Sequence, residues 1–140
     1  MNAILFLLHM LGFGTAFGAS VGNAAILRLV AAAPADAPVL GKVPPVLARI
    51  GQVGLAFLWA TGLIMVWSVY GGPQNLPGLF WIKFVCVIGV TGGVVMLDLT
   101  MRAVRAGDQA ARARLPLYGA ATGALLLLVV IFAVLSFYEH

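Results

Sequence analysis

A single histidine lies inside a long apolar segment at the start of the chain. His9 belongs to the stretch 3–27, which contains no Asp, Glu, Lys or Arg. A neutral imidazole in such a place can hydrogen-bond a neighbouring helix, or it can be a metal ligand, namely an axial ligand of haem iron. The second histidine, His140, is the terminal residue. A haem held by two histidines on facing helices is therefore not expected within one chain.

A lone imidazole ligand leaves the other side of the iron to a different group. The candidates in this sequence are the thioether of Met65 and the amine of Lys83, besides an open position or a histidine from a second subunit. His9, Met65 and Lys83 are thus the candidate cofactor-binding residues, and the cofactor that suits them is haem b. A copper site of His9, Met65 and Cys86 is the alternative, because soft sulfur ligands suit Cu(I).

Lys83 brings a positive charge into an apolar stretch, 79–101. An ammonium group inside a membrane span is costly unless it snorkels to the interface or is paired. Lys83 lies near the start of its stretch, so snorkelling is one interpretation. In the other, it points inward to a propionate, an anionic substrate or iron, and is the candidate catalytic residue. Asp98, near the far end, is expected either to pair with Arg102 at i,i+4 or to relay protons.

Four apolar stretches account for most of the chain, at about 3–27, 46–70, 79–101 and 116–138. The 140 residues are 63% hydrophobic and 9% charged, with a mean hydropathy of +1.10, whereas soluble domains carry about 25% charged residues. Each stretch can cross the ~30 Å hydrocarbon core of a lipid bilayer as a helix. The sequence therefore predicts an all-α integral membrane protein: a single domain over 1–140, folded as a four-transmembrane-helix bundle of up-down topology.

Three glycines repeat at four-residue intervals in the first stretch: Gly14, Gly18 and Gly22. Residues four apart lie on one face of a helix, and glycines on such a face let two helices approach closely. The repeat predicts helix packing through this face. It also predicts self-association, as a homodimer or within a larger membrane complex.

Basic residues collect on two of the three predicted loops. Lys83 is the exception, and the others lie on or beside the first and third loops: Arg28, Lys42, Arg49, Arg102, Arg105, Arg112 and Arg114. Positively charged loops stay in the cytoplasm, so both termini are expected on the outer, periplasmic side of a bacterial inner membrane. The basic loops lack the interleaved aromatic residues of a nucleic-acid platform, so no nucleic-acid partner is expected. The prolines of the first loop are expected to prevent a helix there, and Pro116 is expected to begin the fourth helix.

Four short motifs occur in order along the apolar stretches. They are H-x-x-G at 9–12, A-T-G-L-I at 60–64, W-I-K at 81–83 and L-L-L-L-V-V-I-F-A-V at 125–134. This order resembles the small HemJ-type protoporphyrinogen oxidases and the related CopD-like membrane domains.

The resemblance implies a four-helix membrane protein that binds b-type haem and acts as a haem-dependent oxidoreductase on a porphyrinogen. His9 and Lys83 match by position the histidine and lysine that are associated with function in that family. Two other function classes stay open. One is a non-catalytic accessory or assembly subunit of a larger membrane complex, and the other is a CopD-like copper or small-solute transport protein.

Overall fold

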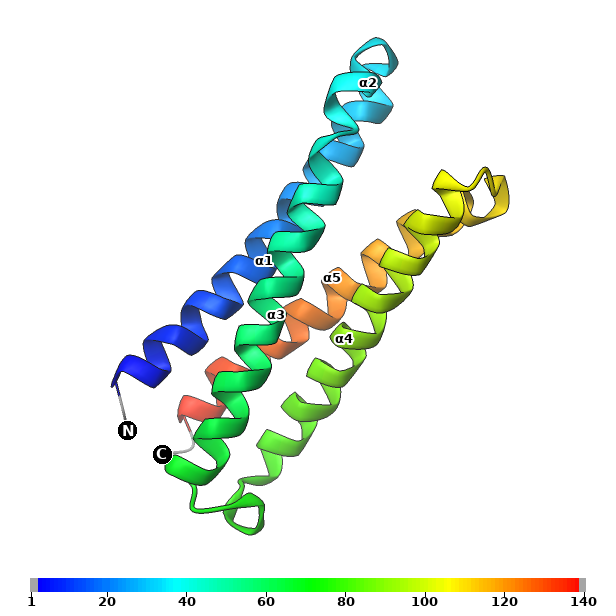
Figure 1. Ribbon diagram of the computed structural model, residues 1–140. Coiled ribbons are helices and arrows are strands. Elements are labelled where there is room, and N and C mark those ends of the chain that lie inside the picture. Colours follow the sequence, from blue (N-terminus) through cyan, green and yellow to red (C-terminus); the bar gives the residue numbers. More distant parts are fainter. Residues whose placement is uncertain (1–2, 139–140) are drawn as a thin grey trace. The chain divides into compact units, whose positions relative to one another are not determined.

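The computed structural model describes residues 3–138, with side chains to residue 135, and this part of the chain is helical with short connections (Figure 1). Its long helices are α1 (Ala3–Ala32), α3 (Val43–Ser68), α4 (Gly78–Arg105) and α5 (Gln109–Tyr138). A short helix, α2 (Ala37–Leu40), and two 3₁₀ turns, η1 (Pro34–Asp36) and η2 (Pro73–Asn75), lie in the connections. The terminal His140 lies outside the described residues.

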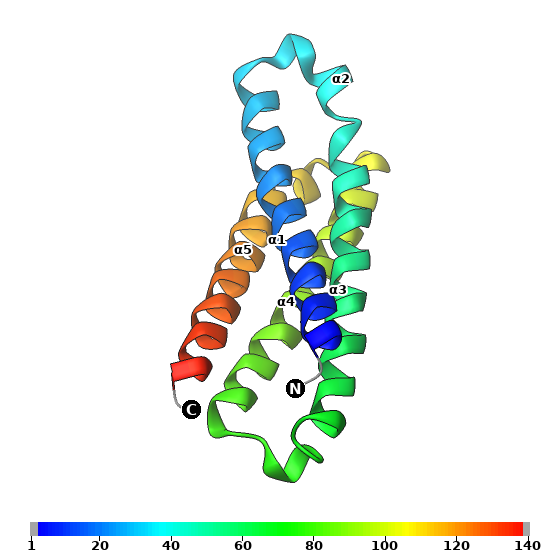
Figure 2. The ribbon, with the colours of Figure 1, turned by 90° about the vertical axis from the view of Figure 1, so that its left-hand side faces the viewer.

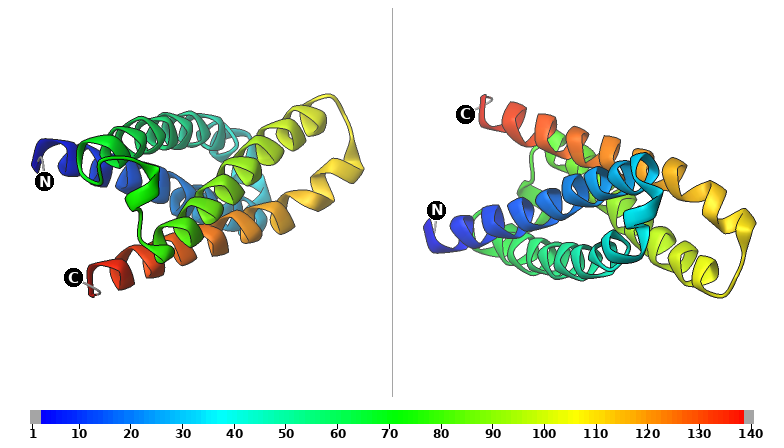
Figure 3. Two further views of the ribbon diagram at one scale, coloured as in Figure 1. Left: turned by 90° about the horizontal axis from the view of Figure 1, so that it is seen from below. Right: turned by 90° about the horizontal axis from the view of Figure 1, so that it is seen from above.

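All four long helices are long and apolar enough to cross a membrane. The prediction of four apolar helices is therefore confirmed. The chain divides after Asn75 into two compact units, of which the first contains α1 and α3 and the second α4 and α5. Within each unit two helices run side by side in opposite directions (Figures 2 and 3). How the two pairs combine into one bundle stays a prediction.

The helices extend beyond the apolar stretches that predict them. α1 continues past Arg28 to Ala32, and α5 begins at Gln109. The start of α5 is fixed by Asp108, whose Oδ1 accepts hydrogen bonds from the backbone N–H groups of Ala110 (2.9 Å) and Ala111 (3.2 Å). An acidic side chain at this position satisfies N–H groups that have no partner inside the helix.

The predicted start of the fourth helix at Pro116 is wrong, because Pro116 lies inside α5. Hydropathy marks where a helix can enter lipid, and the backbone is already helical before that point.

The ion pair near the end of α4 is confirmed: a guanidinium nitrogen of Arg102 lies 2.7 Å from Oδ2 of Asp98, and the guanidinium Nε donates to the same oxygen at 2.9 Å. Both residues lie at the polar end of the helix, one turn apart.

The first unit is held together where small residues of α1 meet small residues of α3. Gly12 and Ala16 of α1 and Gly54 of α3 are buried. A Cβ atom added at Gly54 would lie 2.8 Å from the backbone nitrogen of Ala16 and 2.8 Å from the backbone oxygen of Gly12. These distances leave no room for a side chain, so the two backbones are in direct contact. Such contacts are typical of helix pairs in membranes, where small residues permit close packing.

The second unit uses the same principle with different residues. A Cβ at Gly93 of α4 would collide with the hydroxyl of Thr122 on α5, and one at Gly89 would lie 3.1 Å from a methyl group of Leu125. Val90 of α4 and Leu126 of α5 are buried, with exposed fractions of 2% and 3%. α4 and α5 therefore meet through glycines on one helix and larger side chains on the other.

The backbone contact at Gly54 makes a testable prediction. Gly54→Ala places a methyl group where only main-chain atoms can yield, so α1 and α3 must separate. We expect a loss of about 1–3 kcal/mol in the free energy of unfolding, the usual cost of overpacking a tight interface. Unfolding by SDS titration from mixed micelles, followed by circular dichroism, measures this change.

Gly14→Ala is the matched control, because a Cβ at Gly14 meets no atom within 4 Å. This variant should unfold at the wild-type midpoint or above it, since alanine favours the helix over glycine. Equal midpoints for the two variants would show that the backbones do not touch at Gly54.

Candidate functional site

The side chain of His9 reaches from α1 to α3 and is anchored there by a threonine. Its Nδ1 lies 2.8 Å from the hydroxyl oxygen of Thr61. Thr61 is only 4% exposed, and its hydroxyl also donates to the backbone oxygen of Phe57, one turn earlier, at 2.6 Å. The imidazole, the hydroxyl and the carbonyl therefore form a short hydrogen-bonded chain across the helix pair. The half-buried His9 is thereby fixed at one of its two nitrogens.

The residue after Thr61 provides the space for the imidazole. A Cβ atom added at Gly62 would lie 3.5 Å from Cε1 of His9 and 4.0 Å from its Nδ1. The ring therefore lies against the backbone of α3 at this glycine. We call Thr61 and Gly62 together the imidazole seat. Both residues belong to the A-T-G-L-I motif, and His9 belongs to H-x-x-G, so the first unit brings these two motifs together.

Gly12, which ends the H-x-x-G motif, contacts α3 one turn away from the seat. A Cβ at Gly12 would lie 3.1 Å from the backbone oxygen of Gly54 and 3.2 Å from the backbone nitrogen of Leu58. Gly12 and His9 lie three residues apart and so share one side of α1. The close approach of the backbones thus occurs where the imidazole must cross to Thr61.

Met65, the candidate second ligand, lies on the same helix as the imidazole seat. It follows Thr61 by four residues on α3, so both occupy one helix face. Its side chain is half-buried. In the pairing of α1 and α3, His9 contacts the turn of α3 that precedes Met65.

Lys83 and Cys86 belong to the second unit. They lie three residues apart near the start of α4, and both side chains are half-buried. Aromatic rings flank this turn: Phe84 stacks on Phe80 with a centroid distance of 6.4 Å and meets the edge of Trp81 at 6.1 Å. Whether Lys83 or Cys86 joins His9 in one site stays a prediction.

The predicted glycine series lies mostly away from the contact between α1 and α3. Cβ atoms added at Gly14 and Gly18 would meet no atom within 4 Å, whereas one at Gly22 would lie 3.3 Å from a methyl group of Leu47. The tight contact uses Gly12 instead, which the sequence argument missed. The small residues of the second stretch, Gly51 and Gly54, are the signal that could have indicated the correct face.

The described residues offer few donors for a metal ion. Residues 3–138 contain no group of three or more His, Cys, Asp or Glu side chains that could hold a metal ion. Haem iron needs only one or two axial ligands from the protein, because the macrocycle supplies four nitrogens. An imidazole anchored through one nitrogen by a hydrogen bond is the usual form of such a ligand. A single ligand such as His9 is compatible with the number of protein ligands that haem iron needs.

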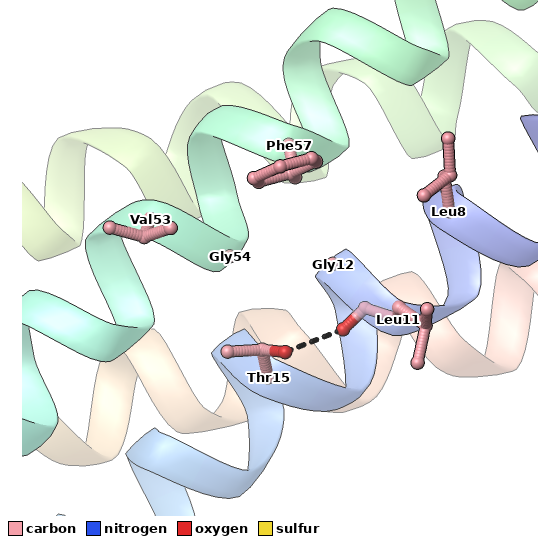
Figure 4. Close-up of a pocket in the computed structure, with 7 residues that line it drawn as sticks. All are labelled: Leu8, Leu11, Gly12, Thr15, Val53, Gly54 and Phe57. Carbon is pink, nitrogen blue, oxygen red and sulfur yellow. Dashed lines mark hydrogen bonds between the residues drawn. The ribbon is translucent and has the colours of Figure 1, made fainter.

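An apolar groove lies along the contact between α1 and α3 (Figure 4). Its volume is about 230 Å³, and seven residues line it: Leu8, Leu11, Gly12, Thr15, Val53, Gly54 and Phe57. Pockets that enclose drug-sized ligands typically have about 300–1,000 Å³. The groove is smaller than that and His9 does not line it, so it is not the candidate haem site.

No protein-family model, curated protein or solved structure matches this chain.

Proposed function

We propose that this protein binds haem b or a related tetrapyrrole in the membrane, as the resemblance to the HemJ-type and CopD-like proteins implies, with His9 as the iron ligand. The observation that carries the proposal is the imidazole seat. A half-buried imidazole needs a hydrogen-bond partner for its N–H, and a partner at Nδ1 makes Nε2 the nitrogen that would bind iron. Here Thr61 supplies this partner at 2.8 Å and Gly62 leaves room for the ring.

Haem is a better candidate than a copper ion because it needs fewer donors from the protein. The copper set of His9, Met65 and Cys86 is divided between the two units, since Cys86 lies on α4. The haem hypothesis needs only His9, with Met65 one turn from the seat as a candidate second ligand. Metal analysis of the purified protein separates the two: iron in proportion to haem supports the proposal, and copper without haem contradicts it.

The remaining roles follow from charge and position. Bound haem would supply one-electron redox chemistry at its iron. His9 would hold the iron through Nε2 and keep it at the level of the seat. Lys83 would bind an anionic group, either a propionate or a carboxylate of a porphyrinogen substrate, because an ammonium group within an apolar helix is stabilised by such a partner. An oxidoreductase acting on a porphyrinogen is the activity that we propose for this arrangement.

The basic loops give the proposed orientation. Arg28 and Arg49 lie near the ends of α1 and α3 that are joined by α2, and Arg102 and Arg105 end α4. Placing these ends in the cytoplasm of a bacterial inner membrane leaves both termini on the periplasmic side. His9, near the start of α1, then lies in the outer half of the bilayer.

The ligand role of His9 can be tested by absorption spectroscopy. Protein purified from cells supplied with haem precursors should show a Soret band. His9→Ala should lose this band, because the other histidine of the sequence is the terminal His140. His140→Ala is the control and should keep the band. Circular dichroism checks that each variant is helical. A folded, colourless wild-type protein, or a band that survives in His9→Ala, would contradict the proposal.

A second candidate function is that of an accessory subunit which associates through α1. The observation that favours it is the open surface at Gly14 and Gly18, beside the exposed side chains of Leu7 and Leu11. Glycines that no helix of their own unit covers are available to another chain. Co-purification with a larger complex in fixed proportion would support an accessory role, whereas a discrete dimer would indicate self-association.

Self-association makes its own prediction. In a Cys86→Ser background, Gly18→Cys should form a disulfide-linked dimer in membranes under mild oxidation, because position 18 would face its copy. Ser20→Cys is the control: at about 100° per residue it lies almost on the opposite side of the helix. Gel electrophoresis without reductant measures the yield. Equal yields at the two positions would argue against a specific glycine interface.

A further inference from the structure

The hydrogen bonds at Thr61 determine which nitrogen of His9 carries the proton. A hydroxyl has one hydrogen to donate and two lone pairs that can accept. The hydrogen of Thr61 is directed to the backbone oxygen of Phe57 at 2.6 Å. The contact with Nδ1 at 2.8 Å must then use a lone pair of the hydroxyl oxygen, so Nδ1 is the donor.

The opposite tautomer would leave a conflict in a buried place. If Nδ1 carried no hydrogen, the hydroxyl of Thr61 would face two acceptors, Nδ1 and the carbonyl of Phe57, with one hydrogen between them. Thr61 is 4% exposed, so water has little access to repair the missing bond. An unsatisfied buried polar group costs about 1–3 kcal/mol. With the tautomer protonated at Nδ1, both hydrogen bonds of the Thr61 hydroxyl can form.

We infer that Thr61 is a positioning residue, which holds His9 in the tautomer that is protonated at Nδ1 and keeps the lone pair on Nε2. The two nitrogens direct their hydrogen or lone pair to different sides of the ring, so Nε2 is turned away from Thr61. The relay from imidazole through hydroxyl to carbonyl also polarises the ring and makes Nε2 a stronger electron donor. Haem iron as the acceptor of that lone pair rests on the proposed function, whereas the tautomer does not.

The tautomer can be measured without haem. We would label the histidines of the haem-free protein with ¹⁵N, remove the second signal by His140→Gln, and record NMR spectra of the neutral ring in lipid. We expect a protonated Nδ1 and an unprotonated Nε2 in the protein with wild-type Thr61. This measurement alone overturns the inference if the proton lies on Nε2, whether or not any variant folds.

Variants of Thr61 test the cause. Thr61→Val removes the acceptor at nearly constant volume, so the proton should move to Nε2 as the major form, whereas Thr61→Ser should restore the wild-type spectrum. Thr100→Val is the matched control, because Thr100 is also buried and donates to the carbonyl four residues earlier, on α4. An unchanged His9 spectrum in a folded Thr61→Val protein would show that Thr61 does not set the tautomer.

Haem binding separates this inference from the proposed function. If both hold, Thr61→Val should weaken haem affinity by about tenfold or more, as loss of a hydrogen bond behind a metal-binding histidine does, and Thr61→Ser should recover it. The expected tautomer in a protein that never binds haem would refute the proposed function and support the inference. Haem binding through His9, together with an unaltered tautomer in Thr61→Val, would support the proposed function and refute the inference.

Discussion

The contact between the backbones of α1 and α3 is the constraint on which the candidate site depends. At ordinary helix packing the axes lie about 8–10 Å apart, with side chains filling the space between them. Gly12 and Gly54 remove those side chains, and a Cβ on Gly54 would stand 2.8 Å from main-chain atoms of α1. Because the backbones meet there, His9 can reach a hydroxyl that lies close to the surface of α3. If the axes of α1 and α3 lay further apart, the imidazole could not reach the hydroxyl of Thr61.

The threonine hydroxyls in these apolar helices share one local hydrogen-bonding arrangement. All five threonines donate their hydroxyl hydrogen to the carbonyl four residues earlier. This bond gives the hydroxyl hydrogen an acceptor inside the helix, where lipid offers none. It leaves the lone pairs of the hydroxyl oxygen available to accept other hydrogen bonds. At Thr61 an acceptor is used by His9. The direction of the hydrogen bond between the two helices is therefore imposed by a bond within one of them.

The long helices could be predicted from the sequence, but the pairing of their faces could not. Apolar stretches of sufficient length indicated α1 and α3, and the spacing of Asp98 and Arg102 indicated their ion pair, because these are properties of neighbouring residues. The faces at Gly12 and at Gly14 both carry small residues at helical spacing, so periodicity alone does not choose between them. The choice depends on which face of another helix, 40 residues away, offers a matching surface. For the same reason the hydrogen bond between His9 and Thr61 could not be predicted from the sequence.

The two short motifs gain a physical meaning from this pairing. In H-x-x-G the histidine and the glycine lie three residues apart on one side of α1, so the glycine brings the backbones together where the histidine has to cross. In A-T-G the threonine supplies the acceptor and the glycine supplies the space for the ring. Each motif is too short and too apolar to be informative by itself. Together they specify one arrangement, in which an imidazole is fixed at Nδ1 and its other nitrogen is set as an electron donor.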